Sequence, residues 1–584
     1  MAEDMCWAGV SLIPKGEGGK PLDMRPITVT SIIYRLWAGI RVRQSAAWQA
    51  QWLHKGQHGG RPGHSTSEAL VGVTLAFEKA ILNGEPLTGI AIDLAKAFDN
   101  VPQEIMFEVL RAFGADSGLL QGMRAMYEQI NRRFKIGRYV GAEFRATNGI
   151  LQGCPLSVMM LNALMAVLHL ALDEVGVYGE SYVDDLTILD GATERLQAAI
   201  DEMAAFMDLT DQRVNEAKTK AFGTDGDPGL VYKGVPLKFT EEVKLLGVRL
   251  RFAEGAAHFK YTDDVVERLI DLMSRIRHAG FPFHQRGMLV AGLVGSRLAY
   301  GSEVLDLTAA QEKRLRVAAG RAVWQKRSTQ RAPGLLLTLF VKGHVTDPAQ
   351  ILHVRRMGSL QRLVRMRPEL RQDLLAVWGA KRQRVRLRGA GPVANLVHST
   401  RRLGLHRGGD DLTFQTCEGD VDMEAVPPLK WHHIAREHAR RMVWLQVEKD
   451  RARSGNASGM ASGIDRTKTL CHYARAPAST QGILRKILLG AVWTQTLRAK
   501  MPGIHESTVC QKCSKGCAED LRHLWWDCPA WDHLRLTRLQ GVTEGRSRCF
   551  ERYGIATVEE DADIKTVVAM HKQLVRIFIA RFRQ

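Results

Sequence analysis

Three aspartates lie at the ends of apolar segments, where a negative charge needs a partner. Asp93 lies at the end of the predicted strand 89–94, and the adjacent pair Asp184 and Asp185 lies in the segment YVDDL. Carboxylates flanked by buried residues are costly unless a cation neutralises them, although an aspartate pair alone is also typical of an ordinary turn. Mg²⁺ binds such oxygens together with substrate phosphates, and two such ions can activate a hydroxyl and stabilise a leaving pyrophosphate. These residues are therefore candidate ligands for two Mg²⁺ ions, with Mn²⁺ as an alternative, and an ordinary turn remains the other interpretation.

A second group of candidate ligands lies near the C-terminus. Its pattern is Cys-x2-Cys-x9-His-x4-Cys, formed by Cys510, Cys513, His523 and Cys528. Three thiolates and one imidazole suit tetrahedral Zn²⁺ in a closed, structural site, and a unit this small is expected to need the metal to fold. Cys517 is an alternative ligand, and an accidental group of reduced cysteines is the other interpretation. The neighbouring tryptophans, which could stack on bases or cover the zinc site as a small core, are Trp525, Trp526 and Trp531.

The composition is that of a globular protein with a polyanionic partner. The 584 residues are 45% hydrophobic and 24% charged, which excludes bulk disorder. The formal net charge is +19 at pH 7. Residues 301–400 alone hold 19 basic and 6 acidic side chains. Solvated helix faces are the alternative explanation, but they do not account for such localisation, so nucleic acid is the expected partner.

The densest part of this basic stretch is interleaved with apolar residues. Val385 and Leu387 alternate with arginines, which favours a strand or an extended arm that follows a phosphate backbone. A nuclear-localisation signal fits equally well and places the protein inside the cell, in the nucleus. The basic residues of this run are Lys381, Arg382, Arg384, Arg386 and Arg388.

Cysteine usage and the N-terminal segment indicate a reducing compartment. The nine cysteines are scattered and odd in number, which argues against a disulfide framework. The N-terminus contains acids and no apolar core, so no secretory signal is expected. Residues 150–172 carry no formal charge, but Gln152, Asn162 and His169 are costly in lipid. We therefore expect a buried helix there, a soluble protein and no membrane partner.

A mixture of strands and helices must position these residues. Apolar runs predict strands at 89–94, 182–189 and 243–250, the second of them bent at the paired aspartates. Residues 192–210 have helical spacing, and Asp99 is expected to cap a helix that runs to about Phe113. Amphipathic helices are expected between residues 262 and 330. The mixture predicts an α+β fold with a small central sheet.

Eight short motifs, taken in their order along the chain, resemble those of a reverse transcriptase. They are most similar to the non-LTR (LINE-type) retrotransposon branch. The motifs are LIPK (12–15), RPI (25–27), GGRPGHST (59–66), AIDLAKAFDNVP (91–102), GILQGCPLS (149–157), YVDDL (182–186), NEAKTK (215–220) and KLLGV (244–248). The resemblance is strong over residues 10–250 and weaker to about 330. Independently, the segment DLRHLWWDCPAW is similar to the zinc-binding region that follows the polymerase in this group.

The resemblance implies a right-hand polymerase with additional nucleic-acid-binding parts. The expected domains are fingers and a palm with a small antiparallel sheet (1–250), a helical thumb-like region (251–330), a mostly helical basic connecting region (331–500), a zinc module (501–540) and a C-terminal tail helix (541–584).

The resemblance also assigns roles at the catalytic carboxylates and at the sugar. Asp93 and Asp184 match the principal metal ligands, and Asp185 completes the acidic triad. Phe98 matches a bulky aromatic residue that lies under the sugar and clashes with a ribose 2′-hydroxyl, although a plain core aromatic is the alternative.

Five further residues match positions around the incoming nucleotide. Lys15 and Arg25 match fingers residues that contact the triphosphate, where cationic donors offset its charge. Gln152 and Gly153 match the loop that abuts nucleotide and template, and glycine permits a close backbone approach there. Lys218 matches a palm lysine near the phosphates, a candidate proton donor to pyrophosphate.

The implied reaction is templated addition of deoxynucleoside monophosphates to a primer 3′-hydroxyl. RNA template, DNA primer or target, and dNTPs are the expected partners. Because only eleven residues precede Leu12 and no endonuclease pattern is visible, an N-terminally truncated element is expected. The alternatives are a catalytically inactive nucleic-acid-binding remnant, a group II intron maturase-like protein or an RNA-dependent RNA polymerase. Phe98 and the YVDD segment argue against ribonucleotide synthesis.

Overall fold

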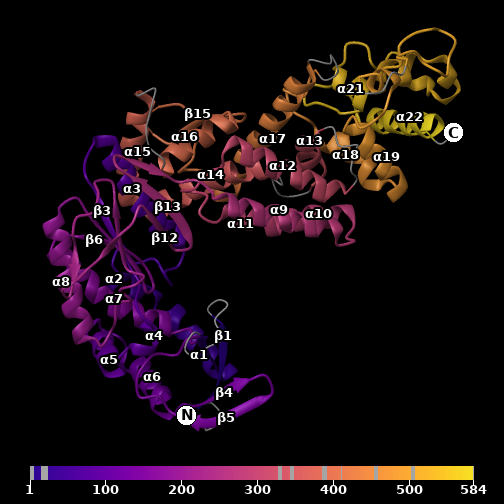
Figure 1. Cartoon of the computed structure of the whole chain (residues 1–584). Helices are drawn as coiled ribbons and strands as arrows, with labels where there is room; N and C mark the ends of the chain where they lie inside the picture. The colour runs from indigo at the N-terminus through magenta and orange to yellow at the C-terminus, as the bar shows by residue number, and fades with distance from the viewer. Residues whose placement is uncertain are drawn as a thin grey trace. The chain divides into compact units, whose positions relative to one another are not determined.

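A computed structural model describes the chain as two compact units (Figure 1). Unit 1 comprises residues 1–260, 303–305 and 363–395, and unit 2 comprises residues 261–302, 306–362 and 396–584. Within these ranges the structure describes residues 6–14, 24–325, 332–341, 347–383, 391–409, 411–452, 458–500 and 507–582. The finer division of the sequence at 330, 500 and 540 stays a prediction.

Unit 1 mixes strands and helices. Its helices are α1 (Ile32–Gln44), α2 (Ala46–Trp52), α3 (Thr66–Asn83), α4 (Ala97–Asn100), α5 (Gln103–Ala112), α6 (Ser117–Gln129), α7 (Ser157–Glu174), α8 (Thr193–Leu209) and α15 (Pro368–Gln383). Its strands are β1 (Trp7–Pro14), β2 (Met24–Thr30), β3 (Thr88–Ile92), β4 (Asn131–Ile136), β5 (Tyr139–Phe144), β6 (Tyr178–Tyr182), β7 (Asp185–Asp190), β8 (Lys220–Gly223), β9 (Val231–Tyr232), β10 (Val235–Pro236), β11 (Lys238–Phe239), β12 (Glu242–Leu245), β13 (Val248–Ala253) and β14 (Ala256–His258). The predicted α+β class is confirmed.

A five-stranded sheet with the order β11-β8-β3-β7-β6 forms the centre of unit 1. Strand β3 pairs antiparallel with both β7 and β8, and β6 and β7 form a hairpin at one edge. Helix α3 contacts β6 and in turn carries α15, whereas α7 and α8 contact β6 and β7 (Figure 1). The predicted strands at 89–94 and 182–189 and the helix at 192–210 are therefore confirmed as β3, the β6–β7 hairpin and α8.

The core of unit 1 lies between this sheet and helices α5 to α8. Helix α3 begins with a capping box in which Ser65 and Glu68 satisfy each other's backbone donors, and it ends at Gly84 with φ +73°. Helix α7 is the segment of the described residues that is long and apolar enough to cross a membrane, and 67% of it is buried inside the protein. Its fully buried leucines and methionines belong to the main cluster of unit 1, which is the pattern of a core helix.

Two smaller sheets complete unit 1. A four-stranded sheet has the order β2-β1-β4-β5, with β1 and β4 parallel. The second has the order β12-β13-β14. The prediction of one strand over 243–250 is wrong, because Leu246 and Gly247 adopt φ values of +45° and +83° and turn the chain into the β12–β13 hairpin. Two successive positive φ angles are the geometry of a tight hairpin turn.

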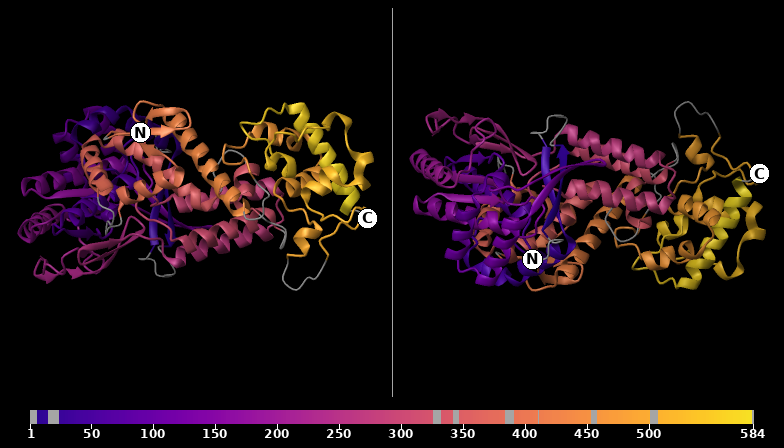
Figure 2. Two further views of the ribbon diagram at one scale, coloured as in Figure 1. Left: turned by 90° about the horizontal axis from the view of Figure 1, so that it is seen from above. Right: turned by 90° about the horizontal axis from the view of Figure 1, so that it is seen from below.

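Unit 2 is mainly helical, and its long helices α9 and α12 pack along each other (Figures 1 and 2). The elements that begin in it are α9 (Asp263–His278), α10 (Phe283–Leu289), η3 (Val290–Val294), α11 (Gly295–Ala299), α12 (Ala309–Trp324), α13 (Pro333–Leu335), η4 (Leu336–Phe340), α14 (Pro348–Met366), β15 (His406–Arg407), β16 (Thr413–Thr416), β17 (Gly419–Asp422), α17 (Pro428–Ala452), α18 (Arg466–Arg475), α19 (Ala478–Leu488), α20 (Gln495–Arg498), η5 (His523–Asp527), η6 (Pro529–Leu534), η7 (Thr537–Leu539), α21 (Arg548–Tyr553) and α22 (Ile564–Phe582). Helix α16 (Pro392–Leu403) begins in unit 1. The amphipathic helices expected between 262 and 330 are present as α9 to α12.

Candidate functional site

Strand register brings the three predicted catalytic aspartates to one end of the central sheet. Ile92 of β3 pairs with Leu186 of β7, so the next residues in register are Asp93 and Asp185. Tyr182 pairs with Asp185 at the end of the β6–β7 hairpin, and Val183 and Asp184 form the two-residue turn between them. Directly opposed residues of antiparallel strands lie about 5 Å apart, so these carboxylates share a small volume.

The turn itself has a strained backbone. Val183 has φ +64°, in the left-handed region that a β-branched residue rarely adopts. Such outliers cost roughly 1–3 kcal/mol and persist where the surroundings hold them. The surroundings here include Gly59, where an added Cβ would lie 2.4 Å from Val183 Cγ2 and 2.6 Å from its backbone nitrogen. The loop 53–64 therefore fits closely against the catalytic turn.

The environment of Asp185 raises the pKa of its carboxyl group. Partial desolvation, followed by repulsion from Asp184 and Asp93, raises the pKa of Asp185 to about 6, and the cations Lys218 and Arg25 oppose that rise. A carboxylate whose pKa is raised by two other carboxylates is a group that a divalent cation would hold in its ionised form. The donor set of three carboxylates suits Mg²⁺.

Lys218 also lies beside the three carboxylates, on a loop that is hydrogen-bonded to the end of β3. Its Nζ is 3.4 Å from Asp93 Oδ2. The loop that carries it is held to the end of β3, because Asn215 donates its backbone N–H to the Asp93 carbonyl (2.7 Å) and the Asp93 N–H donates to Thr219 Oγ1 (3.2 Å). The predicted palm lysine therefore lies beside the carboxylates.

The loop before α7 connects the carboxylate end of the sheet with strand β2. Gln152 accepts a hydrogen bond on its carbonyl from the Thr28 N–H (2.7 Å). Gly153 has φ +114°, and an added Cβ would lie 2.7 Å from the Thr28 carbonyl oxygen. Glycine is required by both the backbone angle and the close approach. Arg25, which lies three residues before Thr28 on β2, is exposed. Lys15 lies outside the described residues.

Asp99 does not cap a helix. It lies inside α4, and its Oδ1 accepts a hydrogen bond from Gln152 Nε2 at 2.9 Å, whereas Pro102 occupies the N-cap position of α5. The capping prediction is therefore wrong, because a long-range amide competes for this carboxylate. Phe98 is half-buried against the core, and its carbonyl accepts from the Ile150 N–H (2.7 Å). The structure thus joins the segments 97–100 and 149–153.

The C-terminal ligand group converges as its spacing predicts. One ligand atom from each of Cys510, Cys513, His523 and Cys528 lies within 4.8 Å of the others. The Sγ atoms of Cys510 and Cys528 are 3.9 Å apart, and tetrahedral zinc with bonds of about 2.3 Å would hold two sulfurs about 3.8 Å apart. Burial raises the pKa of the Cys528 thiol to about 12, so a cation is what would hold it as a thiolate. The four residues fit Zn²⁺.

Cys517 stands outside this group of four. Its Sγ is 3.7 Å from Nδ1 of His523, whereas Cys513 Sγ is 3.5 Å from Nε2. The backbone of Cys517 instead accepts a hydrogen bond from the Cys510 N–H (2.9 Å). The His523 nitrogen that faces Cys513 is thus Nε2, whereas Cys517 faces Nδ1.

The tryptophans beside the ligands form a small core. Trp525 is fully buried and donates its indole N–H to the Arg552 carbonyl (3.1 Å). Trp531 is buried, and half-buried Trp526 donates to the Glu551 carbonyl (2.9 Å). Helix α22 packs on the same segments. Of the two interpretations, the geometry favours the covering core over base stacking.

Most of the basic run lies outside the described residues. Arg384, Arg386 and Arg388 are not described, and for Lys381 and Arg382 only the backbone is, as the last turn of α15. The strand or extended arm predicted from the alternation of Val385 and Leu387 with arginines therefore stays a prediction, and α15 runs up to it through Gln383.

Sequence reasoning assigned no role to two groups that hold the catalytic turn. Gly59 belongs to a glycine pair that the motif comparison included, and that pair was the available signal. Glu180 of β6 and Arg367 form a buried ion pair, Nη1 to Oε1 2.8 Å, between residues far apart in the chain. No local pattern indicates that pair.

Comparison with known proteins identifies the first part of the chain. Residues 13–250 match the family model "Reverse transcriptase (RNA-dependent DNA polymerase)". The Pol polyprotein of the type-2 retrotransposable element R2DM from Drosophila melanogaster is 26% identical over 330 residues, which are 52% of this chain and 31% of that protein. A Pol polyprotein of the type-1 element R2 from Popillia japonica is 25% identical over 321 residues, 51% of this chain and 44% of that protein.

The chain spans less than half the length of these relatives. Among solved structures, apo telomerase from Candida tropicalis aligns with TM-score 0.36 and 13% identity, over 65% of this chain and 67% of that one. The central sheet with β3 and the β6–β7 hairpin, together with the family match over residues 13–250, agrees with the expected polymerase fold of that part of the chain. Residues 13–250 match the reverse transcriptase family, and about half of the chain is similar to the Pol polyproteins of R2 retrotransposable elements.

Proposed function

We propose that this chain is an RNA-directed DNA polymerase that adds deoxynucleoside monophosphates to a primer 3′-hydroxyl. The observation that carries the proposal is the convergence of Asp93, Asp184 and Asp185 at one end of the central sheet, within a domain of the reverse transcriptase family. The partners proposed with it are an RNA template, a DNA primer or target, and dNTPs.

The carboxylates would hold the divalent ions. Asp93, Asp184 and Asp185 are the proposed Mg²⁺ ligands, with Mn²⁺ as an alternative ion. When bound, the ions would lower the charge of the phosphates and favour ionisation of the primer hydroxyl. Asp93 is fixed by two backbone hydrogen bonds to the 215–219 loop, and Asp185 by strand pairing, so little reorganisation is needed at the site.

Cationic and polar residues would orient the nucleotide. Lys218, 3.4 Å from Asp93, stands close enough to the carboxylates to approach a phosphate held there and to donate a proton to leaving pyrophosphate. Arg25 acts on the same charges from β2, and Lys15 is proposed as its fingers partner. The loop at Gln152 and Gly153 is held against Thr28 and would form one wall for the nucleotide and template.

A structural Zn²⁺ is proposed at the C-terminal group of four ligands. It would join the segment that contains Cys510 and Cys513 to the segment that contains His523 and Cys528, which the buried tryptophans cover. Such a closed site has no open position for substrate, so its contribution is to folding.

Primer extension on an RNA template with Mg²⁺ and dNTPs tests the function. We expect extension by the wild type and none by the isosteric double variant Asp184→Asn/Asp185→Asn. Asp201→Asn, on the exposed side of α8, is the matched control and should extend like the wild type. A folded wild type that binds the RNA template but extends no primer would replace the proposal with the inactive-remnant alternative.

A further inference from the structure

The strand that carries the catalytic turn is an edge strand. In the order β11-β8-β3-β7-β6, strand β6 has β7 as its one full neighbour among the described residues. Its outer edge is closed by the loop 53–64: Ser181 donates its N–H to the Gly56 carbonyl (2.7 Å), and the His58 N–H donates to the Ser181 carbonyl (2.9 Å). An edge strand has unpaired backbone groups along one side, so what holds that side decides how firmly the strand is placed.

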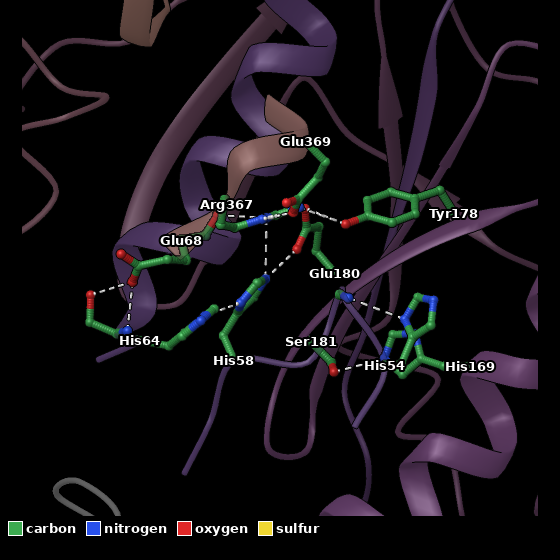
Figure 3. A network of polar contacts seen from close by, with 12 residues as sticks. His54, His58, His64, Glu68, His169, Tyr178, Glu180, Ser181, Arg367 and Glu369 are labelled. Atoms are coloured by element: carbon green, nitrogen blue, oxygen red, sulfur yellow. Dashed lines mark hydrogen bonds and ion pairs between the residues drawn. The ribbon is translucent and has the colours of Figure 1, made fainter. Parts of the chain in front are cut away.

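A buried polar network holds the same strand through its side chains (Figure 3). Tyr178 and Glu180 point to one face of β6, and Arg367 reaches both of them. The Arg367 Nη1 donates to Glu180 Oε1 (2.8 Å), and Nη2 donates to Tyr178 Oη (2.8 Å). Nε donates to Glu369 Oε1 (2.7 Å). His58 Nε2 lies 2.5 Å from Glu180 Oε2, so the second carboxylate oxygen also has a partner.

The ion pair and the histidine at the centre of this network are buried. Arg367 is 1% exposed, Glu180 is 2% exposed and His58 is 0% exposed. Burial opposes the charge of Arg367, but the ion pair with Glu180 and the hydrogen bonds more than offset it, so the pKa of Arg367 is raised. Removing one partner of such a pair leaves an uncompensated buried charge, whereas removing both does not.

Helix α3 is shaped to admit this ion pair. At Gly72, an added Cβ would lie 1.9 Å from Glu180 Oε1 and 2.9 Å from Arg367 Nη1. The Arg367 Nη1 also donates to the Glu68 carbonyl of the same helix (3.3 Å). A glycine in the interior of a helix costs roughly 1 kcal/mol relative to alanine. This one has a packing reason, because the space it leaves is occupied by the ion pair.

Arg367 comes from outside the reverse transcriptase domain. The family match ends at residue 250, and Arg367 lies between α14 and α15, in the segment 363–395 that belongs to unit 1. Glu180 is four residues before Asp184 on a rigid two-stranded hairpin. A displacement of Glu180 would therefore be transmitted along β6 to the strained turn at Val183 and to the metal-binding carboxylates.

We propose that Arg367 is a positioning residue for the catalytic turn: by holding Glu180 it fixes edge strand β6, and with it the positions of Asp184 and Asp185. The inference rests on the proposed polymerase function and assigns part of its active-site geometry to a segment beyond the family domain. Arg367 touches no reacting atom and acts through Glu180.

Steady-state primer extension on the full chain tests the proposal. We expect Arg367→Met to lower kcat per folded molecule about tenfold and to raise the Mg²⁺ concentration needed for half-maximal rate several-fold, with a small change in the KM for dNTP. Arg367→Lys keeps the charge but loses the planar fork, so its kcat should lie between those of the wild type and Arg367→Met. This variant also tests the proposal if Arg367→Met does not fold. The double variant Arg367→Met/Glu180→Gln should regain the melting temperature but not kcat.

Lys79→Met is the matched control. Lys79 of α3 and Asp373 of α15 also form an ion pair within unit 1, but at the surface (2.7 Å; side chains 45% and 41% exposed). Its loss should leave kcat and the Mg²⁺ requirement at wild-type values. A double variant that regains both stability and kcat, or an Arg367→Met with wild-type kcat per folded molecule, would show that the ion pair only stabilises the fold and would overturn the proposal.

Hydrogen exchange separates this outcome from a failure of the polymerase function itself. If the wild type extends no primer, the function fails, and amide exchange then decides the positioning role alone. We expect Arg367→Met to speed exchange in residues 178–186 while residues 88–92 of the central strand β3 stay protected. Equal exchange of 178–186 in variant and wild type would contradict the proposal.

Discussion

Asp185 holds its proton to a higher pH than an ordinary aspartate does. Partial desolvation and the charges of Asp184 and Asp93 raise its pKa in the folded chain to about 6, from an ordinary value of about 3.9. A raised carboxyl pKa stabilises the fold at low pH, and this contribution is lost as pH rises through about 4 to 6. Without metal, Asp185→Asn should therefore raise the free energy of unfolding at pH 8 by about 1 kcal/mol, after allowance for solvent screening.

Urea denaturation at pH 8 and pH 5, with and without Mg²⁺, checks this expectation for Asp185→Asn. The gain should shrink at pH 5, where the wild-type carboxyl is largely protonated, and it should disappear with Mg²⁺, which stabilises only the wild type. A variant that is less stable than the wild type at pH 8 in metal-free buffer would show that the three carboxylates do not repel one another.

Phe98 is the residue whose substitution should change the choice of sugar. It is half-buried at the edge of the core, its carbonyl accepts a hydrogen bond from the Ile150 N–H, and the role proposed for its ring is to exclude a ribose 2′-hydroxyl. Phe98→Ala should lower the preference for dNTP over rNTP, measured as a ratio of kcat/KM values, by a factor of about 10 to 100. A ratio is insensitive to the amount of folded enzyme.

Phe113→Ala provides the control for Phe98→Ala. Phe113 packs partly buried against the same core, stacked on Trp52 with ring centroids 5.1 Å apart. Its truncation removes a similar volume away from the Gln152 loop and should leave the sugar preference at the wild-type value. Equal ratios in both alanine variants would assign Phe98 to packing alone.

At the scale of elements, the catalytic hairpin and the loop 53–64 form one closely packed assembly. Gly59→Ala would place a Cβ 2.6 Å from the Val183 backbone nitrogen, so the turn has to move. We expect a loss of about 1–3 kcal/mol in stability and a larger proportional loss of primer extension. Thermal melting and kcat per folded molecule measure the two effects.

Gly39→Ala is the control for that substitution. Gly39 lies inside α1 with nothing within 4 Å of an added Cβ. The same chemical change should there stabilise the protein by roughly 0.5–1 kcal/mol, because alanine favours the helix. Wild-type kcat in Gly59→Ala would show that the turn tolerates displacement.

Elements with a strong local pattern could be predicted from the sequence, and those decided by distant partners could not. The apolar run of β3, the hairpin at Asp184 and the spacing of α8 are local signals, and all three elements are present. The hairpin at Leu246 and Gly247 was missed because an apolar run continues across the turn, although the glycine marked it. Asp99 was misassigned because its partner Gln152 is 53 residues away.

At the scale of the whole molecule, the sequence indicates the composition and the order of the motifs, but not which distant segments of the chain pack together. The basic excess of residues 301–400 predicted a polyanionic partner, yet Arg367 of that stretch is buried on Glu180. An arginine in a basic segment gives no local sign that it will pair with a carboxylate 187 residues earlier. The convergence of the four Cys and His side chains, in contrast, was predictable because they lie within twenty residues and their spacing itself carries the signal.

Zinc bound at the four Cys and His ligands should stabilise the C-terminal part of unit 2, and its removal should not affect the stability of the central sheet of unit 1. The ligands lie under Trp525 and against segments that pack on α22, whereas the sheet has its own core. A zinc-selective chelator, with Mg²⁺ kept in excess, should speed hydrogen exchange and proteolysis in residues 507–582 and leave residues 88–92 protected, since structural zinc contributes on the order of 10 kcal/mol to folding.

Cys513→Ser should reproduce this effect and lose the bound zinc measured by elemental analysis. Cys517→Ser, which lies outside the four converging ligands, should keep the metal. Loss of zinc from Cys517→Ser, with retention in Cys513→Ser, would exchange the roles of the two cysteines, and protection of 507–582 after complete zinc removal would show that the tryptophan core folds this segment alone.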